Sequence, residues 1–383
     1  SLRRQLQMCI RDRFTNNEDD YRHIKRIANL YTEERNEIAN KYDALLFVSF
    51  GGPEGRDDVL PYLENVLRGK PVPRSRMLEV AEHYYHFDGV SPINQQNRDL
   101  IEALEEELKA QDIQLPVYWG NRNWHPMLAD TMAKMKEDGV SRVLVFITSA
   151  YSSYSGCRQY RENIQEASAL IDPLLEFDKL RVFYNHPGFV NTIADLLTES
   201  LKSFDESVRD KATILFTAHS IPDGMAANCS YAAQLQNTAE LIMEKMAGNP
   251  WHLVYQSRSG PPTQPWLEPD VCDFIESLKA TQNPSQIAVV PIGFISDHME
   301  VLFDLDTEAA QVCDSLGIKM VRVPTVGTDP RFVRMIVELI KERTFGVEKQ
   351  SLGDRGPSHD VCPVDCCLYA PKRPPMAGRP VSD

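Results

Sequence analysis

Residues 212–222 read ATILFTAHSIP, a short apolar, β-branched run that ends at a histidine and a proline. Residues that are apolar on both faces of such a run predict a strand buried in a parallel sheet, here over 212–217. Similar runs occur at 44–50, 115–119, 142–149, 180–184, 252–256, 286–292 and 318–323. Between them lie longer segments of helical spacing, such as 96–110, 190–203 and 231–247. This alternation predicts repeated strand–helix–strand units.

The order of these units predicts an α/β fold, with two doubly wound, Rossmann-like parallel-sheet domains that face each other across a cleft. We expect a first domain over 42–185, a second over 186–328, and a helix over 329–345 that returns to the first. Residues 1–41 are expected to form a leader and an N-terminal helix (19–39), and 346–383 a cysteine-containing tail. In such folds ligands bind at the carboxyl ends of the strands.

Composition and charge exclude several classes of protein. The net charge of −14 argues against a nucleic-acid partner, which would require a basic surface to neutralise phosphates. The 383 residues contain no apolar run of roughly 18–20 residues, so we expect no transmembrane segment and predict a cytoplasmic monomer. The turn at 51–53 (GGP) matches neither glycine-rich phosphate-binding pattern, so no nucleotide cofactor is expected.

A second informative stretch is PIGFISDHMEVLFDLDTE at 291–308, which runs from a strand end into a helix. Glu300, Asp304 and Glu308 are spaced so that their carboxylates follow one helical face, about 6 Å apart per step. Such a row can be a solvated acidic face, because repulsion costs only about 0.2–0.5 kcal/mol per pair. His298 at the strand–helix junction favours a metal site instead, since carboxylate and imidazole together suit a divalent cation.

The histidine of the first stretch is a candidate for chemistry. The predicted strand brings His219 to its carboxyl end, where a neutral imidazole can bind iron or accept a proton. A histidine in this place can also be a core residue whose hydrogen bonds are satisfied. No GxSxG pattern surrounds Ser220, so acyl transfer by a serine nucleophile is not predicted.

The eight cysteines are distributed unevenly. Cys362, Cys366 and Cys367 form a C-x₃-C-C pattern, and three thiolates plus a fourth brought in by folding match the ligand count of a [2Fe–2S] cluster. Tetrahedral zinc fits the spacing almost as well. The default interpretation of isolated cysteines is a small buried hydrophobic residue, and this applies to Cys9, Cys229, Cys272 and Cys313.

Several motifs occur in the order known from one family. These are FGGPEG (50–55), HFDGVSPINQQNR (86–98), SGCRQYREN (155–163), LFTAHSIP (215–222), YQSRSGPPTQPWLEP (255–269) and PIGFISDHMEVLFDLD (291–306). They resemble ferrochelatase motifs, especially those of the actinobacterial-type enzymes that act on coproporphyrin III. The resemblance implies a chelatase-like fold with a porphyrin cleft, and an enzyme of haem biosynthesis that inserts the substrate Fe²⁺ into coproporphyrin III to give coprohaem.

The resemblance also implies roles for individual residues. His219 and Glu300 would face each other across the macrocycle, coordinate Fe²⁺ and accept the two pyrrole protons. A flanking relay or second metal site would use His298, Asp304 and Glu308. Contacts with the porphyrin are expected from Ser91, Tyr160, Arg68, Trp266 and Phe50, the last at a place where some relatives have a tyrosine. Cys157 would be the fourth ligand of the [2Fe–2S] cluster, with zinc, a disulfide or free thiols as alternatives.

Three other functions remain open. The substrate could be protoporphyrin IX, which has two propionates where coproporphyrin III has four. A related chelatase would insert cobalt or nickel into a tetrapyrrole. A non-catalytic haem-binding iron–sulfur protein is the third alternative, although a row of proton acceptors would have no purpose there.

Overall fold

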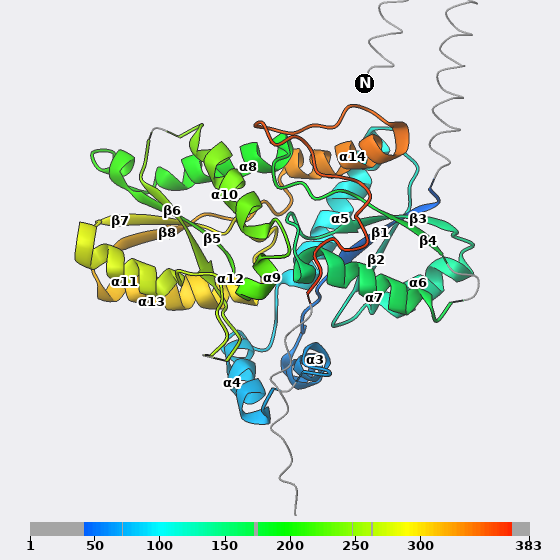
Figure 1. Cartoon of the computed structure of the whole chain (residues 1–383), viewed down its shortest axis with the longest axis horizontal. Coiled ribbons are helices and arrows are strands. Elements are labelled where there is room, and N and C mark those ends of the chain that lie inside the picture. Colours follow the sequence, from blue (N-terminus) through cyan, green and yellow to red (C-terminus); the bar gives the residue numbers. More distant parts are fainter. Residues whose placement is uncertain (1–41, 71, 172–174, 247, 262, 370–383) are drawn as a thin grey trace, which may run out of the picture.

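The computed structural model describes residues 42–70, 72–171, 175–246, 248–261 and 263–369. It contains two four-stranded sheets, side by side in Figure 1, whose strands all pair in parallel. The first sheet has the order β2 (Val117–Asn121), β1 (Ala44–Ser49), β3 (Arg142–Ile147) and β4 (Glu176–Lys179). The second has the order β6 (Trp251–Gln256), β5 (Thr213–His219), β7 (Gln286–Val290) and β8 (Lys319–Arg322). The predicted α/β fold is confirmed.

Helices cover both faces of each sheet (Figure 1). One layer consists of α5 (Ile93–Ala110), α8 (Pro187–Leu201), α10 (Tyr231–Met243) and α14 (Pro330–Phe345). The other consists of α6 (Leu128–Glu137), α7 (Gln159–Ser168), α11 (Val271–Gln282) and α13 (Ala310–Ser315). Helix α5 illustrates why these helices pack on the sheets. Its residues Leu100, Leu104 and Leu108 recur at helical spacing and form one apolar face, and all three are buried.

One hydrophobic core runs through both sheets. It contains buried residues from β1, β3, β5 and β7 and a group of aromatic rings at Phe47, Phe146, Phe183, Phe189 and Phe332. Full burial of a side chain of this size contributes roughly 1.5–3 kcal/mol. Because the two sheets share this core, the carboxyl ends of their strands are held in a fixed relation.

One predicted strand is misplaced. Residues 180–184 were expected to form the fourth strand of the first sheet, but that strand is β4, Glu176–Lys179, which has a polar sequence and lies at the sheet edge. Residues 180–184, apolar except for Arg181, are buried because they cross from the first sheet to the second through the shared core. Their burial comes from tertiary packing and not from strand pairing.

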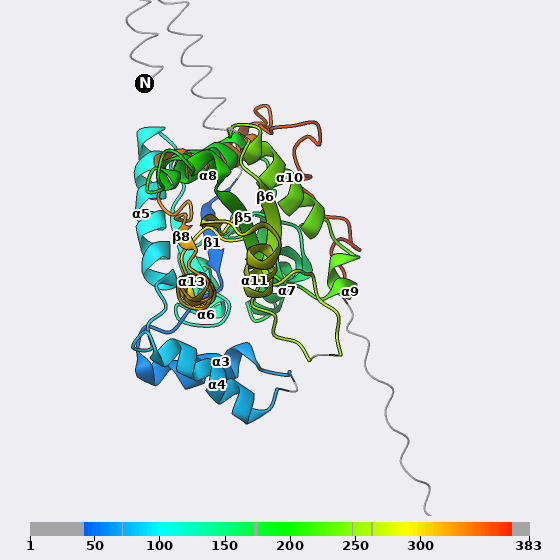
Figure 2. The same ribbon diagram turned by 90° about the vertical axis from the view of Figure 1, so that its left-hand side faces the viewer.

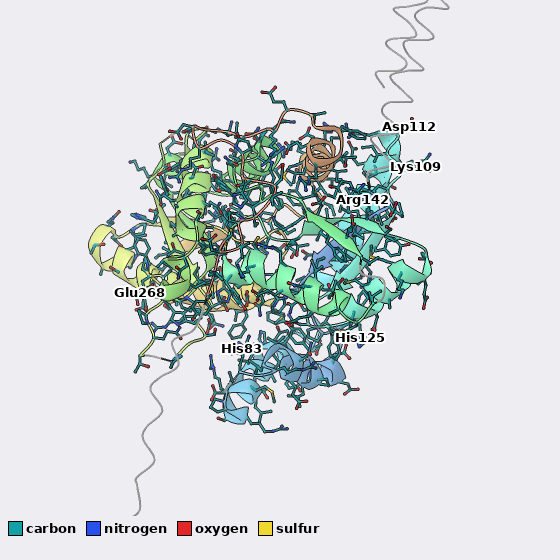
Figure 3. All side chains as sticks on the ribbon, turned by 45° about the vertical axis from the view of Figure 1, so that its right-hand side comes forward. His83, Lys109, Asp112, His125, Arg142 and Glu268 are labelled. Atoms are coloured by element: carbon teal, nitrogen blue, oxygen red, sulfur yellow. The ribbon has the colours of Figure 1, made fainter. Side chains whose placement is uncertain are left out.

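Two helices that the sequence did not predict lie between β1 and α5. These are α3 (Val59–Val66) and α4 (Arg74–Tyr85), which pack on each other below the sheets (Figure 2). The pair touches the second half of the chain through His83, labelled in Figure 3. Its ring stacks on Phe303 with centroids 3.7 Å apart and planes at 11°.

Helix α14 and the residues after it close the fold. The helix packs on α5 and on α8, and the chain then runs back over the molecule towards α7. We propose a domain boundary near residue 185, because β4 completes the first sheet before it and β5 opens the second after it. Among the described helices, none is long and apolar enough to span a membrane. The predicted leader, the helix over 19–39 and Cys9 lie outside the described residues.

Candidate active site

The buried strand β5 brings His219 to the carboxyl edge of the second sheet, as predicted. The Nδ1–H of His219 donates to the carbonyl oxygen of Ser220, so Nε2 faces the Glu300 carboxylate, 3.5 Å from Oε1. The His219 side chain is 31% exposed and that of Glu300 45%, which leaves both accessible to a ligand. A flat ring between the two groups would need about 7 Å, twice an optimal carbon contact. At 3.5 Å the two groups are therefore too close for such a ring to lie between them in this arrangement.

The two side chains hold each other in the charged state. Burial alone would lower the pKa of His219, but the nearby Glu300 carboxylate outweighs it and raises the pKa to about 9. Burial in turn would raise the pKa of Glu300, but the His219 imidazolium lowers it to about 2. Near neutral pH the pair is an ion pair, and His219 must lose a proton before Nε2 can bind a metal.

A second imidazole flanks the carboxylate. His298 is the N-cap of α12 (Met299–Phe303), where its Nδ1 accepts the backbone N–H of Glu300 at 3.1 Å. Its Nε2 lies 3.9 Å from Oε2 of Glu300, and its ring meets Phe294 edge-on. Burial lowers the pKa of His298. Glu300 thus lies between a charged and a neutral imidazole.

The acidic row continues beyond α12, but not on a uniform α-helix. Residues Asp304–Ala309 form a π-helical turn, which shifts Asp304 and Glu308 from an ideal single face. Asp304 accepts hydrogen bonds from the Ser257 hydroxyl and from Gln256 Nε2, the latter at 3.4 Å. Burial, together with Glu300 and Glu308, raises the pKa of Asp304 to about 7. Glu308 is exposed as a residue. Partial burial of its carboxyl group, together with the charge of Asp270, raises its pKa.

The structure brings two predicted porphyrin contacts together around a residue that the sequence analysis missed. The Arg122 guanidinium lies 5.6 Å from the ring centroid of Phe50 and 4.5 Å from that of Tyr160. Its Nε donates to Asn163 at 2.7 Å. Burial raises the pKa of Tyr160, and the charges of Arg122 and Glu300 both act on the same phenol. Arg122 directly follows β2. Because ligands in this fold bind at the carboxyl ends of strands, this position in the sequence could have identified Arg122 as a candidate site residue.

The other predicted contacts are dispersed. Trp266 lies beside the loop that follows His219, and its buried indole N–H has no hydrogen-bond partner among the described residues. Ser91 is buried against Gly52, where an added Cβ would come within 2.7 Å of the Ser91 side chain. Arg68 is exposed just after α3. The structure therefore groups Phe50 with Tyr160, places Trp266 near His219, and leaves Arg68 at the surface.

The segment that carries His298 and Glu300 is fixed from both halves of the molecule. Asp297 N–H donates to Gln96 Oε1 at 2.8 Å, and Gln96 Nε2 donates back to the Asp297 carbonyl at 3.4 Å. Arg322 on β8 donates to Asp297 Oδ1 at 2.8 Å and to both carboxylate oxygens of Asp306 at 2.8 and 3.0 Å. One guanidinium thus connects the turn before Glu300 to the π-helical turn after it.

The predicted cluster cysteines lie where the tail meets the first half of the chain; Cys157 and Cys367 are buried, and Cys362 and Cys366 are partly exposed. Cys157 is buried in a π-helical turn before α7, and its hydrogen bond with Cys362 raises its own pKa and lowers that of Cys362. Sγ of Cys366 is 3.6 Å from Sγ of Cys367. Four thiols gathered from two distant segments suit the ligand set of a [2Fe–2S] cluster. Cys229 stands alone in the sequence, but in the fold it lies close enough to Cys366 for their charges to interact. Burial raises the pKa of Cys229, and the charge of Cys366 adds to this effect.

The described region matches a known family along most of its length. The family model Ferrochelatase covers residues 42–344. The chain belongs to the ferrochelatase family. A ferrochelatase of Rhodopirellula baltica is 57% identical over 345 residues, which cover 89% of this chain and 97% of that protein. A coproporphyrin III ferrochelatase of Streptomyces coelicolor is 48% identical over 364 residues, with the same coverage of 89% and 97%.

Membership confirms the predicted class of enzyme. A ferrochelatase inserts iron into a porphyrin in haem biosynthesis, so Fe²⁺ and a porphyrin are the substrates. Among solved structures, SirB of Bacillus subtilis aligns with a TM-score of 0.49 at 11% identity, over 79% of this chain and 95% of that chain. The roles of individual residues in this ferrochelatase follow from its own geometry.

Proposed function

We propose that this ferrochelatase inserts Fe²⁺ into coproporphyrin III, with His219 and Glu300 as the residues that handle the metal and the protons. The observation that carries the proposal is the 3.5 Å approach of His219 Nε2 to Glu300 Oε1. Imidazole nitrogen and carboxylate oxygen are a ligand pair that suits ferrous iron. The fixed bond from Nδ1–H to the Ser220 carbonyl orients the ring so that Nε2 is the atom presented.

Proton transfer follows from the charges of the site. Each turnover releases two pyrrole protons as Fe²⁺ enters the ring. The ionised Glu300 carboxylate accepts a proton at the ring, and Asp304, with its pKa of about 7, can take up and release one near neutral pH. We propose that protons pass from Glu300 to Asp304 and then to the exposed Glu308. His298 holds the first of these carboxylates through the N–H of Glu300.

The choice of coproporphyrin III rests on relatives, and one cation at the site could bind a propionate. Proteins of Streptomyces coelicolor and Frankia alni with 48% and 49% identity are coproporphyrin III ferrochelatases. In this chain Arg122, stacked between Phe50 and Tyr160, offers a guanidinium that can pair with a propionate. This guanidinium could pair with a propionate of either porphyrin, so the preference for coproporphyrin III is taken from the relatives.

The test is anaerobic metal insertion followed through the Soret and Q bands, with coproporphyrin III and protoporphyrin IX offered separately. A higher kcat/KM for coproporphyrin III is the expected result. Preference for protoporphyrin IX would reverse the substrate but keep the enzyme. Insertion of cobalt or nickel in place of iron would favour the related chelatase, and tight porphyrin binding without turnover would contradict the proposal.

We also propose that Cys157, Cys362, Cys366 and Cys367 bind a [2Fe–2S] cluster. When bound, it would cross-link the tail to α7, next to the hydrogen bonds that Arg158 Nη1 donates to the carbonyl oxygens of Val364 and Cys366 at 2.8 and 3.0 Å. Cys366→Ser should then give a colourless and less stable protein, whereas Cys272→Ser on α11 should not. Retained visible absorbance in Cys366→Ser would contradict this assignment.

Two proposals rest on the sequence alone, namely that the enzyme is a monomer and that it is cytoplasmic. Analytical ultracentrifugation tests the first, with a single species of 43.5 kDa expected. Cell fractionation tests the second.

A further inference from the structure

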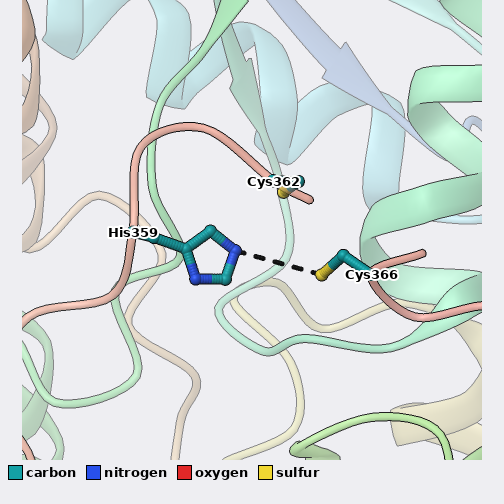
Figure 4. Close-up of side chains that lie close together, drawn as sticks. All are labelled: His359, Cys362 and Cys366. Atoms are coloured by element: carbon teal, nitrogen blue, oxygen red, sulfur yellow. Dashed lines mark hydrogen bonds between the residues drawn. The ribbon is translucent and has the colours of Figure 1, made fainter. Parts of the chain in front are cut away.

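An imidazole lies among the thiols of the tail, and a four-thiolate cluster makes no use of it. Figure 4 shows that the ring of His359 points between Cys362 and Cys366. One ligand atom from each of these three residues lies within 4.8 Å of the other two. Nε2 of His359 is 3.9 Å from Sγ of Cys366.

The spacing of these atoms matches that of donors around one ion. Zinc bound at about 2.3 Å from sulfur and about 2.0–2.1 Å from nitrogen sets a tetrahedral sulfur–nitrogen edge of roughly 3.6 Å. The corresponding distance here is the 3.9 Å between Cys366 Sγ and His359 Nε2, so only a small movement would bring both atoms to a shared metal. Two bridged irons need a wider set of ligands, which the thiols of Cys157 and Cys367 would supply.

We propose that His359, Cys362 and Cys366 bind one tetrahedral divalent cation of the zinc class when no cluster is assembled. Solvent would occupy the fourth position, because His359 is exposed and the two thiols are only partly buried. Thiolate and imidazole donors favour zinc over magnesium or calcium. The inference rests on the proposed cluster in one respect. The zinc ion and the cluster would share Cys362 and Cys366 as ligands, so one molecule could not bind both at once.

The consequence is that the tail can hold either of two metal groups, of which only the cluster would reach outside the tail, through Cys157. With either metal group, the chain around Cys362 and Cys366 stays beside Arg158, whose guanidinium already holds the carbonyl oxygens of Val364 and Cys366. Zinc, whose three protein ligands all lie in the tail, would thus order the loop over 359–366 in molecules that have lost or never received a cluster, without bonding it to the rest of the protein.

The test uses the full chain in two preparations. One is the protein as purified, and the other is freed of any cluster by anaerobic reduction and chelation, then checked for loss of acid-labile sulfide. Zn²⁺ affinity is measured by competition with a chromophoric chelator, and Co²⁺ reports geometry through its d–d and thiolate charge-transfer absorption.

We expect the cluster-free protein to bind one Zn²⁺, and Co²⁺ to show a tetrahedral spectrum. His359→Ala should weaken Zn²⁺ binding by more than about 10-fold, because even groups outside the ligand set are worth about 10–100-fold.

Matched variants separate ligation from general damage. His252→Ala, which replaces a histidine near the start of β6 that packs on Phe274, should leave Zn²⁺ binding unchanged. His359→Cys should restore it and strengthen the thiolate-to-cobalt band. Unchanged affinity and cobalt spectrum in His359→Ala, no binding by the wild type, or no rescue in His359→Cys would each overturn the proposal. Absence of sulfide from the protein as purified would instead contradict the cluster and leave the zinc result standing.

Discussion

Replacing Arg322 with methionine tests whether one guanidinium positions the segment that carries His298 and Glu300. The substitution keeps much of the aliphatic length but removes four hydrogen bonds, one to Asp297, two to Asp306 and one to the Val323 carbonyl. A hydrogen bond to a charged group contributes about 1.5–3 kcal/mol. If the Asp297 bond alone holds the turn in its productive geometry, kcat should fall by about 10- to 150-fold. The partial exposure of both side chains favours the lower end of this range.

The assay compares kcat and KM for iron insertion with the midpoint of urea unfolding. We expect kcat to fall while KM for the porphyrin changes little, because Arg322 is directed at the turn and the π-helical segment. Arg322→Lys should recover part of kcat. Arg331→Met is the matched control, since Arg331 also pairs with two carboxylates, Asp329 and Asp195, at the start of α14. A normal kcat in Arg322→Met, or an equal loss in the control, would refute the positioning role.

Three further predictions follow from the same contacts. Glu300→Gln should slow iron insertion more than Glu308→Gln, because only Glu300 meets His219; equal losses would contradict the relay order. Glu342→Gln should lower the free energy of unfolding by about 3–5 kcal/mol in urea melts, since it leaves the fully buried Arg181 without its carboxylate; a loss under about 1 kcal/mol would show that the ion pair is not essential. Burial lowers the pKa of His186 to about 3, so its share of stability is present above about pH 6.5 and is lost as the pH falls towards 3. Between pH 7 and 5 the wild type should lose about 2 kcal/mol more than His186→Asn, despite the carboxylates of Glu338 and Glu342 that face the ring; parallel pH profiles would refute this.

The sequence was sufficient to predict the architecture because the central strands have a simple physical signature. Every residue of β1 and β7 is buried, and each strand contains an uninterrupted apolar run, over 44–48 and 287–290. The same logic placed His219 correctly at a strand end. It failed at the fourth strand of the first sheet, because β4 is a polar, largely half-buried edge while the mostly apolar segment over 180–184 is buried in the core between the sheets.

The finer geometry of the site could not be predicted, because it depends on contacts between distant segments. Gln96 and Asp297 are 201 residues apart, and their paired hydrogen bonds leave no trace in any local pattern. The acidic spacing indicated one helical face, but the π-helical turn at Asp304–Ala309 changes which carboxylates align. Arg122 carried a usable signal, since it follows a strand end.

The most direct test of the account is iron insertion by His219→Ala, measured beside its porphyrin affinity by fluorescence quenching. The account predicts that coproporphyrin III still binds with nearly normal affinity while iron insertion is lost, because the only change is at the group that presents Nε2 beside Glu300. Near-normal turnover in His219→Ala would contradict the account and remove the imidazole from the mechanism.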